Sequence, residues 1–217
     1  MTFKIYTRSI GPVQVSDDRF DAEEIGKNPL CMPDALAAEN AAAYLDACMA
    51  EQDSSGGVIE CIIHGVPAGI GDPVFDKLDA ALAKAVMSVG AVKGFEIGDG
   101  FAVARATGRT NNDAFCRAAD GAVAKKTNHA GGILGGISDG SDIVLRAAIK
   151  PTPSIAAPQR TVNRDGEEID ISIRGRHDPV IVPRAVVVVE SMAAITIADA
   201  MLVNMSAKMD GVMKFYG

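Results

Sequence analysis

Cysteine is scarce in this sequence, and the few cysteines are not spaced for metal binding. The 217 residues include four cysteines with no C-x-x-C pair, and none of the three histidines lies at metal-ligand spacing from them. This pattern argues against a structural zinc site, and we expect no metal. The thiols are most simply buried groups of a protein in a reducing, cytoplasmic compartment. The four are Cys31, Cys48, Cys61 and Cys116.

An excess of positive charge and an uninterrupted apolar run are also missing. The formal net charge is −7, which is unfavourable for contact with a phosphate backbone, so we expect no nucleic-acid partner. Residues 1–15 contain no apolar run long enough for a signal peptide. The longest apolar stretch, 179–203, is interrupted by Arg184, Glu190 and Asp199. Two carboxylates within a span would be costly in lipid, so we expect a core helix there and no membrane partner.

The remaining pattern predicts a single domain of the α+β class over residues 1–217. Helix-like and strand-like segments are mixed without regular βαβ alternation, and no low-complexity linker divides them. Pro33 and Pro73 are expected at first helical positions, with Asp72 as a cap. The polar residues 106–127 predict a loop that could hold one short helix. Apolar patterns predict strands at 58–66, 91–97, 142–149 and 168–173, and helices at 31–52, 73–88 and 184–206.

A cluster of glycines precedes the strand expected at 142–149. Glycine lets a backbone approach a flat or phosphorylated ligand closely and point N–H groups at it. The alternative is a loop that only needs positive φ, and this alternative is favoured for the cluster taken alone because no Walker or G-x-G-x-x-G pattern is present. The glycines are Gly131, Gly132, Gly135, Gly136 and Gly140.

A lysine follows the same strand in a rigid setting. Lys150 precedes Pro151 and Pro153, which favour extended backbone, and Thr152 and Ser154 add hydroxyl groups. This combination suits an anionic group. The alternative, a solvated lysine at the exit of an edge strand, is favoured for the segment in isolation.

Arg176, His177 and Asp178 stand in a row before the apolar run 185–192, which we interpret as core. In the functional interpretation, Arg176 anchors an anion and Asp178 takes part in proton transfer. In the alternative, Asp178 caps the following helix or pairs with Arg176, and the sequence favours neither. Residues 146–184 carry seven basic and five acidic side chains, a local basic excess that can steer a small anion.

These segments together resemble the chorismate synthase family. The similarity covers nearly the whole chain, and it implies a β-α-β sandwich of antiparallel sheets enclosing helices, assembled as a homotetramer. It also implies conversion of 5-enolpyruvylshikimate 3-phosphate to chorismate and phosphate in the shikimate pathway of aromatic amino acid biosynthesis. That reaction is an anti 1,4-elimination that requires reduced FMN without net redox change. The resemblance is carried by "RHDPVIVPRAVVVVESM" at 176–192, the family's C-terminal signature, and by "NHAGGILGGISDG", "KPTPSI", "GVPAGIGDPVFDKLDA" and "MSVGAVKGFEIGDGF".

The resemblance assigns roles to individual residues. Asp178 matches an aspartate near flavin N5 that assists proton removal from the substrate, and Arg176 matches a residue at the flavin and the substrate phosphate. His177 receives no catalytic role, and His129 is only placed in a loop near the cofactor. Many relatives have asparagine where Gly90 stands. The other matched flavin contacts are Gly90, Ala91, Gly135, Lys150, Pro151, Thr152, Pro153 and Ser154.

Three motifs of the family are absent from the sequence: G-E-S-H-G, R-P-G-H-A-D and G-R-x-S-A-R-E-T. In the family they hold two histidines regarded as catalytic acids and most of the substrate-binding arginines. His64, expected on a strand, is interpreted as structural. We therefore expect a truncated member of the family. Two alternatives stay open: a non-catalytic C-terminal fragment that binds flavin or self-associates, and one part of a split enzyme completed by another chain.

Overall fold

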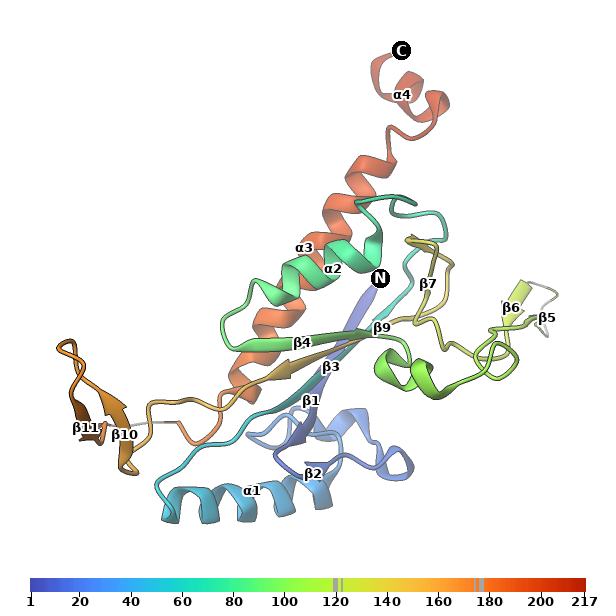
Figure 1. Cartoon of the computed structure of the whole chain (residues 1–217). Helices are drawn as coiled ribbons and strands as arrows, with labels where there is room; N and C mark the ends of the chain where they lie inside the picture. Colours follow the sequence, from blue (N-terminus) through green and yellow to red (C-terminus); the bar gives the residue numbers. More distant parts are fainter. Residues whose placement is uncertain (119–120, 122, 174, 176–177) are drawn as a thin grey trace. The chain divides into compact units, whose positions relative to one another are not determined.

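The computed structural model in Figure 1 describes residues 1–118, 121, 123–173, 175 and 178–217. Helices and strands are mixed in it, and its hairpins are antiparallel, as the sequence predicts. The helices are α1 (Ala35–Ala50), α2 (Leu78–Met87), α3 (Val182–Asn204) and α4 (Met209–Tyr216), with 3-10 turns η1 (Asp17–Arg19), η2 (Ala22–Glu24) and η3 (Gly100–Arg105). The strands are β1 (Thr2–Ile10), β2 (Val13–Gln14), β3 (Gly57–His64), β4 (Val92–Ile97), β5 (Phe115–Arg117), β6 (Val123–Lys125), β7 (Ile133–Leu134), β8 (Ile137–Ser138), β9 (Ile143–Ile149), β10 (Gln159–Val162) and β11 (Glu168–Ile171).

The described strands form one five-stranded sheet and three two-stranded hairpins. The order in the larger sheet is β2-β1-β3-β9-β4, so β3 and β9 are interior strands. Burial alternates along β9, where Ile143, Leu145 and Ala147 are buried and their neighbours are less so. The strands predicted at 58–66, 91–97, 142–149 and 168–173 are all confirmed, with ends shifted by one or two residues.

The chain divides into two compact units. Unit 1 contains residues 1–5, 60–147 and 187–217, and unit 2 contains residues 6–59 and 148–186. The expectation of a single domain over 1–217 stays a prediction.

In unit 1, helix α2 contacts strands β4 and β8. Its buried side chains, Leu78, Leu82 and Val86, recur every four residues and so lie on one face of the helix. The thiol of Cys61, on β3, is fully buried, and burial raises its pKa to about 12. Because the other three cysteines are only partly buried, the prediction of buried thiols is correct for Cys61 alone.

The helix predicted at 73–88 begins five residues later than expected. Phe75 has a φ of 58°, which is outside the right-handed helical region, and its side chain is 92% exposed. The first helical N–H group, on Leu78, instead donates to the carbonyl of Gly136 at 2.8 Å. The cap position is Lys77, without a side-chain hydrogen bond. The prediction that Asp72 caps this helix is therefore wrong.

The apolar run at 185–192 is core on only one face of α3. Val186 and Val189 are buried, whereas Val187 and Val188 are 61% and 43% exposed. A 3.6-residue period separates these pairs onto different faces. Within the described residues α3 is long and apolar enough to cross a membrane by length and composition, a test that a core helix also passes. The helix predicted at 184–206 is confirmed but ends at Asn204, and a separate helix, α4, follows it.

In unit 2, Asp34 fixes the start of α1. Its side chain is 1% exposed and accepts from the N–H groups of Ala37 and Ser16, each at 3.1 Å. The guanidinium of Arg19 donates to both carboxylate oxygens, at 3.2 and 3.0 Å. Burial alone would raise the pKa of this carboxyl, but these hydrogen bonds hold it below its usual value. Pro33 therefore precedes the cap and is not the first helical residue as predicted.

We expect Asp34→Ala to lower the free energy of unfolding by about 3 kcal/mol, because it removes a helix cap together with charged hydrogen bonds. Urea unfolding monitored by circular dichroism measures this loss. Asp46→Ala, at an exposed position of the same helix, is the matched control and should change stability by less than about 0.5 kcal/mol. Equal losses in the two variants would show that Asp34 is not the anchor of α1.

Candidate functional site

The segment 150–154 leaves an interior strand of the sheet. Lys150 follows β9 directly and is exposed. Because β9 lies between β3 and β4, the alternative of an edge-strand exit is wrong. The hydroxyl of Ser54 donates to the carbonyl of Thr152 at 2.7 Å, so a neighbouring loop holds this segment in place.

The turn that contains Asp178 is held by Ser55, the residue after Ser54. The N–H of Ser55 donates to the carbonyl of Pro179 at 2.7 Å, and Ser55 forms an isolated parallel bridge with Val180. Ser54 and Ser55 are adjacent in the chain, so they bring the Lys150–Ser154 segment and the Asp178 turn, which are distant in sequence, close to each other within unit 2.

Asp178 itself pairs with a residue that the sequence did not suggest. Its Oδ2 atom lies 2.6 Å from Nη1 of Arg184, in the first turn of α3, and its side chain is one-third exposed. The alternative that Asp178 pairs with Arg176 cannot be compared with this geometry, because Arg176 and His177 lie outside the described residues. The role of Arg176 stays a prediction.

The glycine cluster in unit 1 forms a tight hairpin. Gly131, Gly132, Gly135, Gly136 and Gly140 all have positive φ, between 61° and 90°. The first two glycines of the loop precede β7, and Gly135 and Gly136 form the two-residue turn between β7 and β8, a turn that requires this conformation. The interpretation of the cluster as a loop that needs positive φ therefore agrees with all five glycines.

Gly132 and Gly136 have no space for a side chain, whereas Gly135 does. A Cβ atom on Gly132 would lie 2.5 Å from the carbonyl oxygen of Asp142, and one on Gly136 would lie 2.5 Å from that of Asp72. A Cβ on Gly135 would meet nothing within 4 Å, and this residue is exposed. Gly135 is therefore open on the side where a Cβ atom would point, and its contact with a flavin stays a prediction.

Gly90 and Ala91 form a second open turn in unit 1, between α2 and β4. Gly90 is exposed, and a Cβ atom added there would meet nothing within 4 Å. Ala91 has a φ of 69°, which is rare for a residue other than glycine. Strained backbone of this kind clusters at ligand-binding sites.

Sequence reasoning missed the carboxylate that organises the loop before the glycines. Residues 106–127 are not irregular throughout, since they contain the β5–β6 hairpin. Asp113, buried before β5, accepts from the hydroxyl of Thr127 at 2.7 Å and from the N–H groups of His129 and Ala130 at 2.8 and 2.9 Å. Burial raises the pKa of its carboxyl, but these hydrogen bonds outweigh burial and lower it to about 2.

His64 and His129 have carboxylate partners in unit 1. Nδ1 of His64, at the end of β3, lies 2.8 Å from Oδ1 of Asp142, which agrees with a structural role. Nδ1 of His129 lies 2.6 Å from Oδ2 of Asp99. Within the described part of the chain, no group of three histidine, cysteine, aspartate or glutamate side chains could hold a metal ion.

Comparison with known proteins identifies the family. A family model described as chorismate synthase matches residues 1–202. The chain is 67% identical over 214 residues to a chorismate synthase of Agathobacter rectalis, covering 99% of this chain and 58% of that protein. It is 55% identical over 202 residues to a chorismate synthase of Archaeoglobus fulgidus, covering 92% and 56%. A solved structure described as "Crystal Structure of Chorismate Synthase" matches with a TM-score of 0.78 at 30% identity, covering 94% of this chain and 58% of the other.

The chain therefore belongs to the chorismate synthase family, and the predicted fold class, antiparallel sheets enclosing helices, is confirmed. The chain spans little more than half the length of the curated relatives that it matches. The matched contacts Gly90, Ala91 and Gly135 belong to unit 1, and Lys150 and Asp178 belong to unit 2. That Arg176, Asp178, Lys150 and the loop 131–136 lie in one small pocket stays a prediction.

We expect Gly132→Ala to destabilise the protein more than Gly135→Ala. Both substitutions place alanine at positive φ, at a cost of about 1–2 kcal/mol, but only the Cβ at residue 132 also collides with backbone. Urea unfolding of the two variants measures the difference, which should exceed about 1 kcal/mol. Equal losses would contradict the close approach of Gly132 to Asp142.

We expect the stabilising contribution of Asp113 to disappear in acid. Its folded-state pKa of about 2 lies below the ordinary value of 3.8, so the contribution is fully present above the ordinary value and is lost as the pH falls through the folded value. The stability difference between the unmodified chain and Asp113→Asn should therefore be smaller near pH 2 than near pH 6, by about 2 kcal/mol. Because all other carboxyl groups are common to both proteins, a difference that does not change with pH would contradict the assigned environment.

Proposed function

We propose that this chain forms part of a chorismate synthase, which converts 5-enolpyruvylshikimate 3-phosphate to chorismate and phosphate with reduced FMN. Family membership supports the proposal, and one observation carries it for the residues involved. Ser54 and Ser55 hold Thr152 and Pro179, so the segment matched to flavin contact and the turn matched to proton transfer are neighbours. Such proximity is what a flavin site with an adjacent acid–base group requires.

The residues present fit a flavin in chemistry and in space. Lys150 offers an exposed cation that suits a phosphate, and Thr152 lies on backbone fixed by its carbonyl. In unit 1, Gly135 and Gly90 leave room in which a side chain would otherwise stand. Arg176 adds a guanidinium fork by its position in the sequence.

Asp178 is proposed to accept the proton that leaves the substrate. A carboxylate can do so when it is held within hydrogen-bond reach of the reacting carbon, and its pair with Arg184 and the fixed Pro179 restrict its orientation. Arg176 is proposed to bind the phosphate of the substrate and to orient it. Reduced FMN, when bound, supplies the electron-rich ring that the elimination requires although no net oxidation or reduction results.

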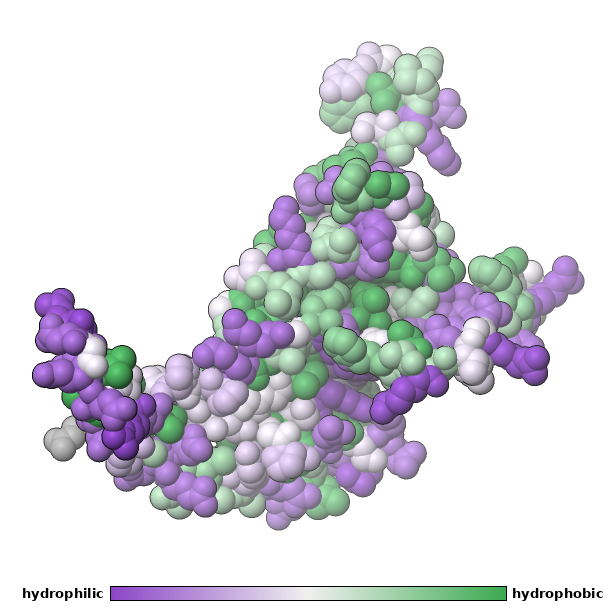
Figure 2. Space-filling model, viewed as in Figure 1, coloured by the Kyte–Doolittle hydropathy of each residue, from purple (hydrophilic) through white to green (hydrophobic). Residues whose placement is uncertain are grey.

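We further propose a cytoplasmic homo-oligomer, a tetramer as the family resemblance implies. Apolar side chains are exposed over the C-terminal end of α3 and over α4 (Figure 2), and contiguous exposed apolar surface promotes association. The β10–β11 hairpin, in contrast, is mostly hydrophilic in this view.

We expect the 217-residue chain to bind FMN, and Lys150→Ala and Arg176→Ala each to weaken binding by about 1–3 kcal/mol, the scale of a lost charged hydrogen bond. Asp178→Asn should hardly change affinity, because its proposed role is proton transfer. Lys84→Ala, at an exposed position of α2, is the control and should have no effect. Flavin fluorescence titration measures all four variants.

The same preparations, assayed with substrate and chemically reduced FMN without oxygen, test the reaction. We expect the 217 residues alone not to turn over at the family's ordinary rate, because the histidine motifs are absent from them and each acid–base group contributes about 10²–10⁴-fold. Ordinary turnover would contradict that expectation. Failure of the unmodified chain to bind FMN would instead favour a module that only self-associates.

A further inference from the structure

A buried lysine joins two carboxylates on either side of the glycine hairpin. Nζ of Lys125, the last residue of β6, lies 2.6 Å from Oδ2 of Asp139 and 3.7 Å from Oδ2 of Asp113. The side chains of Lys125, Asp139 and Asp113 are only 4%, 10% and 4% exposed. Removing one member of such a buried cluster leaves an uncompensated charge, so the cluster is expected to keep a fixed geometry.

The cluster is connected to the backbone at both ends of the hairpin. Asp113 accepts from the backbone N–H groups that follow Asn128, and Asp139 donates its own N–H to the carbonyl of Gly132 at 3.0 Å. Asn128 completes the connection, since its Oδ1 accepts from the N–H of Gly132 and its Nδ2 donates to the carbonyl of Asp142, each at 2.8 Å. We call Asp113, Lys125, Asn128 and Asp139 the loop clamp.

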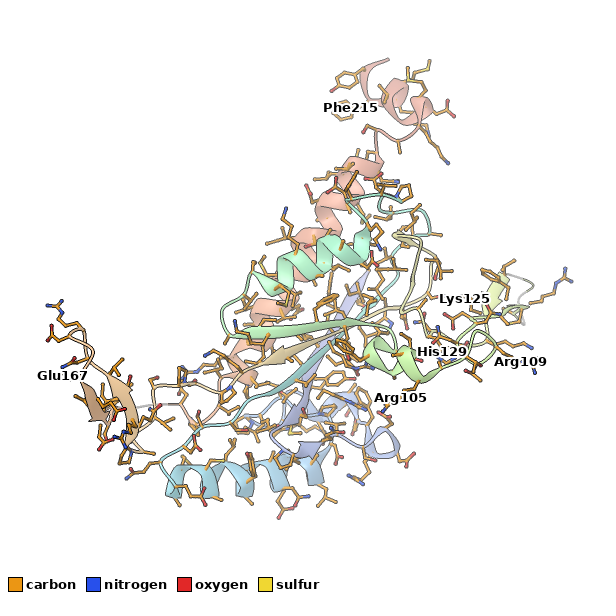
Figure 3. The ribbon with its side chains drawn as sticks, in the orientation of Figure 1. Arg105, Arg109, Lys125, His129, Glu167 and Phe215 are labelled. Atoms are coloured by element: carbon orange, nitrogen blue, oxygen red, sulfur yellow. The ribbon has the colours of Figure 1, made fainter. Side chains whose placement is uncertain are left out.

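A second contact fixes the same turn to the end of β4. The N–H of Asp99 donates to the carbonyl of His129 at 2.9 Å, and the side chains of the two residues are also paired. Gly98 approaches so closely that a Cβ atom there would collide with the carbonyl of His129. Figure 3 shows Lys125 and His129 in the same part of unit 1, near the β5–β6 hairpin.

The hairpin that these contacts hold carries Gly135 at its tip. The turn has only Gly135 and Gly136 between two strands of two residues each, so its own hydrogen bonds give it little independent stability. The second half of the hairpin is also held from outside, since Leu78 donates to the carbonyl of Gly136 and Ser138 is hydrogen-bonded to Ile70. Its first half, which leads from Gly132 to Gly135, is held at Gly132 by Asn128 and Asp139 of the loop clamp.

We propose that Asp113 and Lys125 are positioning residues, which hold the β7–β8 hairpin so that Gly135 is presented to a bound flavin. This inference rests on the proposed function. Neither residue is assigned a contact with flavin or substrate; each acts through the hairpin. If binding needs the held conformation, the apparent affinity falls in proportion to the fraction of molecules in which the hairpin is in place.

The experiment compares Asp113→Asn with a variant that is destabilised elsewhere. The asparagine side chain has one carbonyl oxygen for three donors and no charge for Lys125, so the substitution weakens the clamp with little change of volume. Ile197→Ala, at a fully buried position of α3, lowers stability through an unrelated cavity. Hydrogen–deuterium exchange of the amides at 129–136 and the dissociation constant of FMN are measured for each chain, together with the melting temperature.

In Asp113→Asn we expect the 129–136 amides to exchange at least about tenfold faster and the FMN dissociation constant to rise roughly tenfold. Ile197→Ala should leave both near the values of the unmodified chain although its melting temperature also falls. Unchanged exchange at 129–136 in Asp113→Asn would overturn the proposal. An equal loss of FMN affinity in Ile197→Ala would also overturn it, because a loss of general stability would then suffice.

Two further outcomes are separated by design. If Asp113→Asn does not fold, Lys125→Met replaces it, because that variant removes the cation that both carboxylates face and changes the side-chain volume little. Unchanged exchange at 129–136 in Lys125→Met would overturn the proposal. If the unmodified chain binds no FMN, the proposed function fails for these residues, and the exchange measurement alone decides whether the clamp holds the hairpin.

Discussion

At the start of β3, in unit 2, Gly56 and Gly57 lie very close to the backbone of neighbouring segments. A side chain on Gly56 would collide with the carbonyl of Ile149, and one on Gly57 with the carbonyl of Ser9. The N–H of Gly11 also donates to the carbonyl of Gly56 at 2.9 Å. Only glycine allows this approach. Because two serines come immediately before it, the close contact at Gly56 and Gly57 determines where these serines can hold the Thr152 segment and the Asp178 turn.

Several charged side chains of unit 1 are buried and paired with one another. Arg146 on β9 pairs with the buried Glu60 on β3 and also donates to the carbonyl of Gly98 at 2.9 Å. Lys125 and its two carboxylate partners are buried as well. Ion pairs of this kind add little net stability compared with apolar packing, but they penalise every arrangement that separates them. They therefore restrict the alternatives open to a loop that has few apolar side chains of its own.

The sequence predicted the strands well and several loop details poorly, for physical reasons. The apolar, β-branched composition of β3 and β9 favours a strand wherever it is buried, so those strands were predictable. The start of α2 was not, because it depends on the carbonyl of Gly136, which is supplied from a distant segment. The prediction that Val187 and Val188 belong to the core was wrong because composition cannot show which face of a helix is covered.

The candidate site was predictable to a similar, partial degree. Motif resemblance indicated Lys150, Gly135 and Asp178 as site residues, and their roles stay predictions. The partner of Asp178 was missed although Arg184 is only six residues away, since a short-range pair of this kind depends on the path of the turn. Asp113 was missed because its main partners include backbone N–H groups, and a sequence does not show which backbone groups will lie near a carboxylate.

The open side of Gly135 has a consequence for which residues the position can tolerate over evolutionary time. At Gly132, both the positive φ and the lack of space for a Cβ atom exclude other residues, so substitutions there are not expected. At Gly135 only the left-handed backbone opposes replacement, and asparagine and aspartate adopt that conformation more readily than other residues with a side chain. If the proposed flavin contact were no longer needed, asparagine or aspartate would therefore be the first replacements expected at this position.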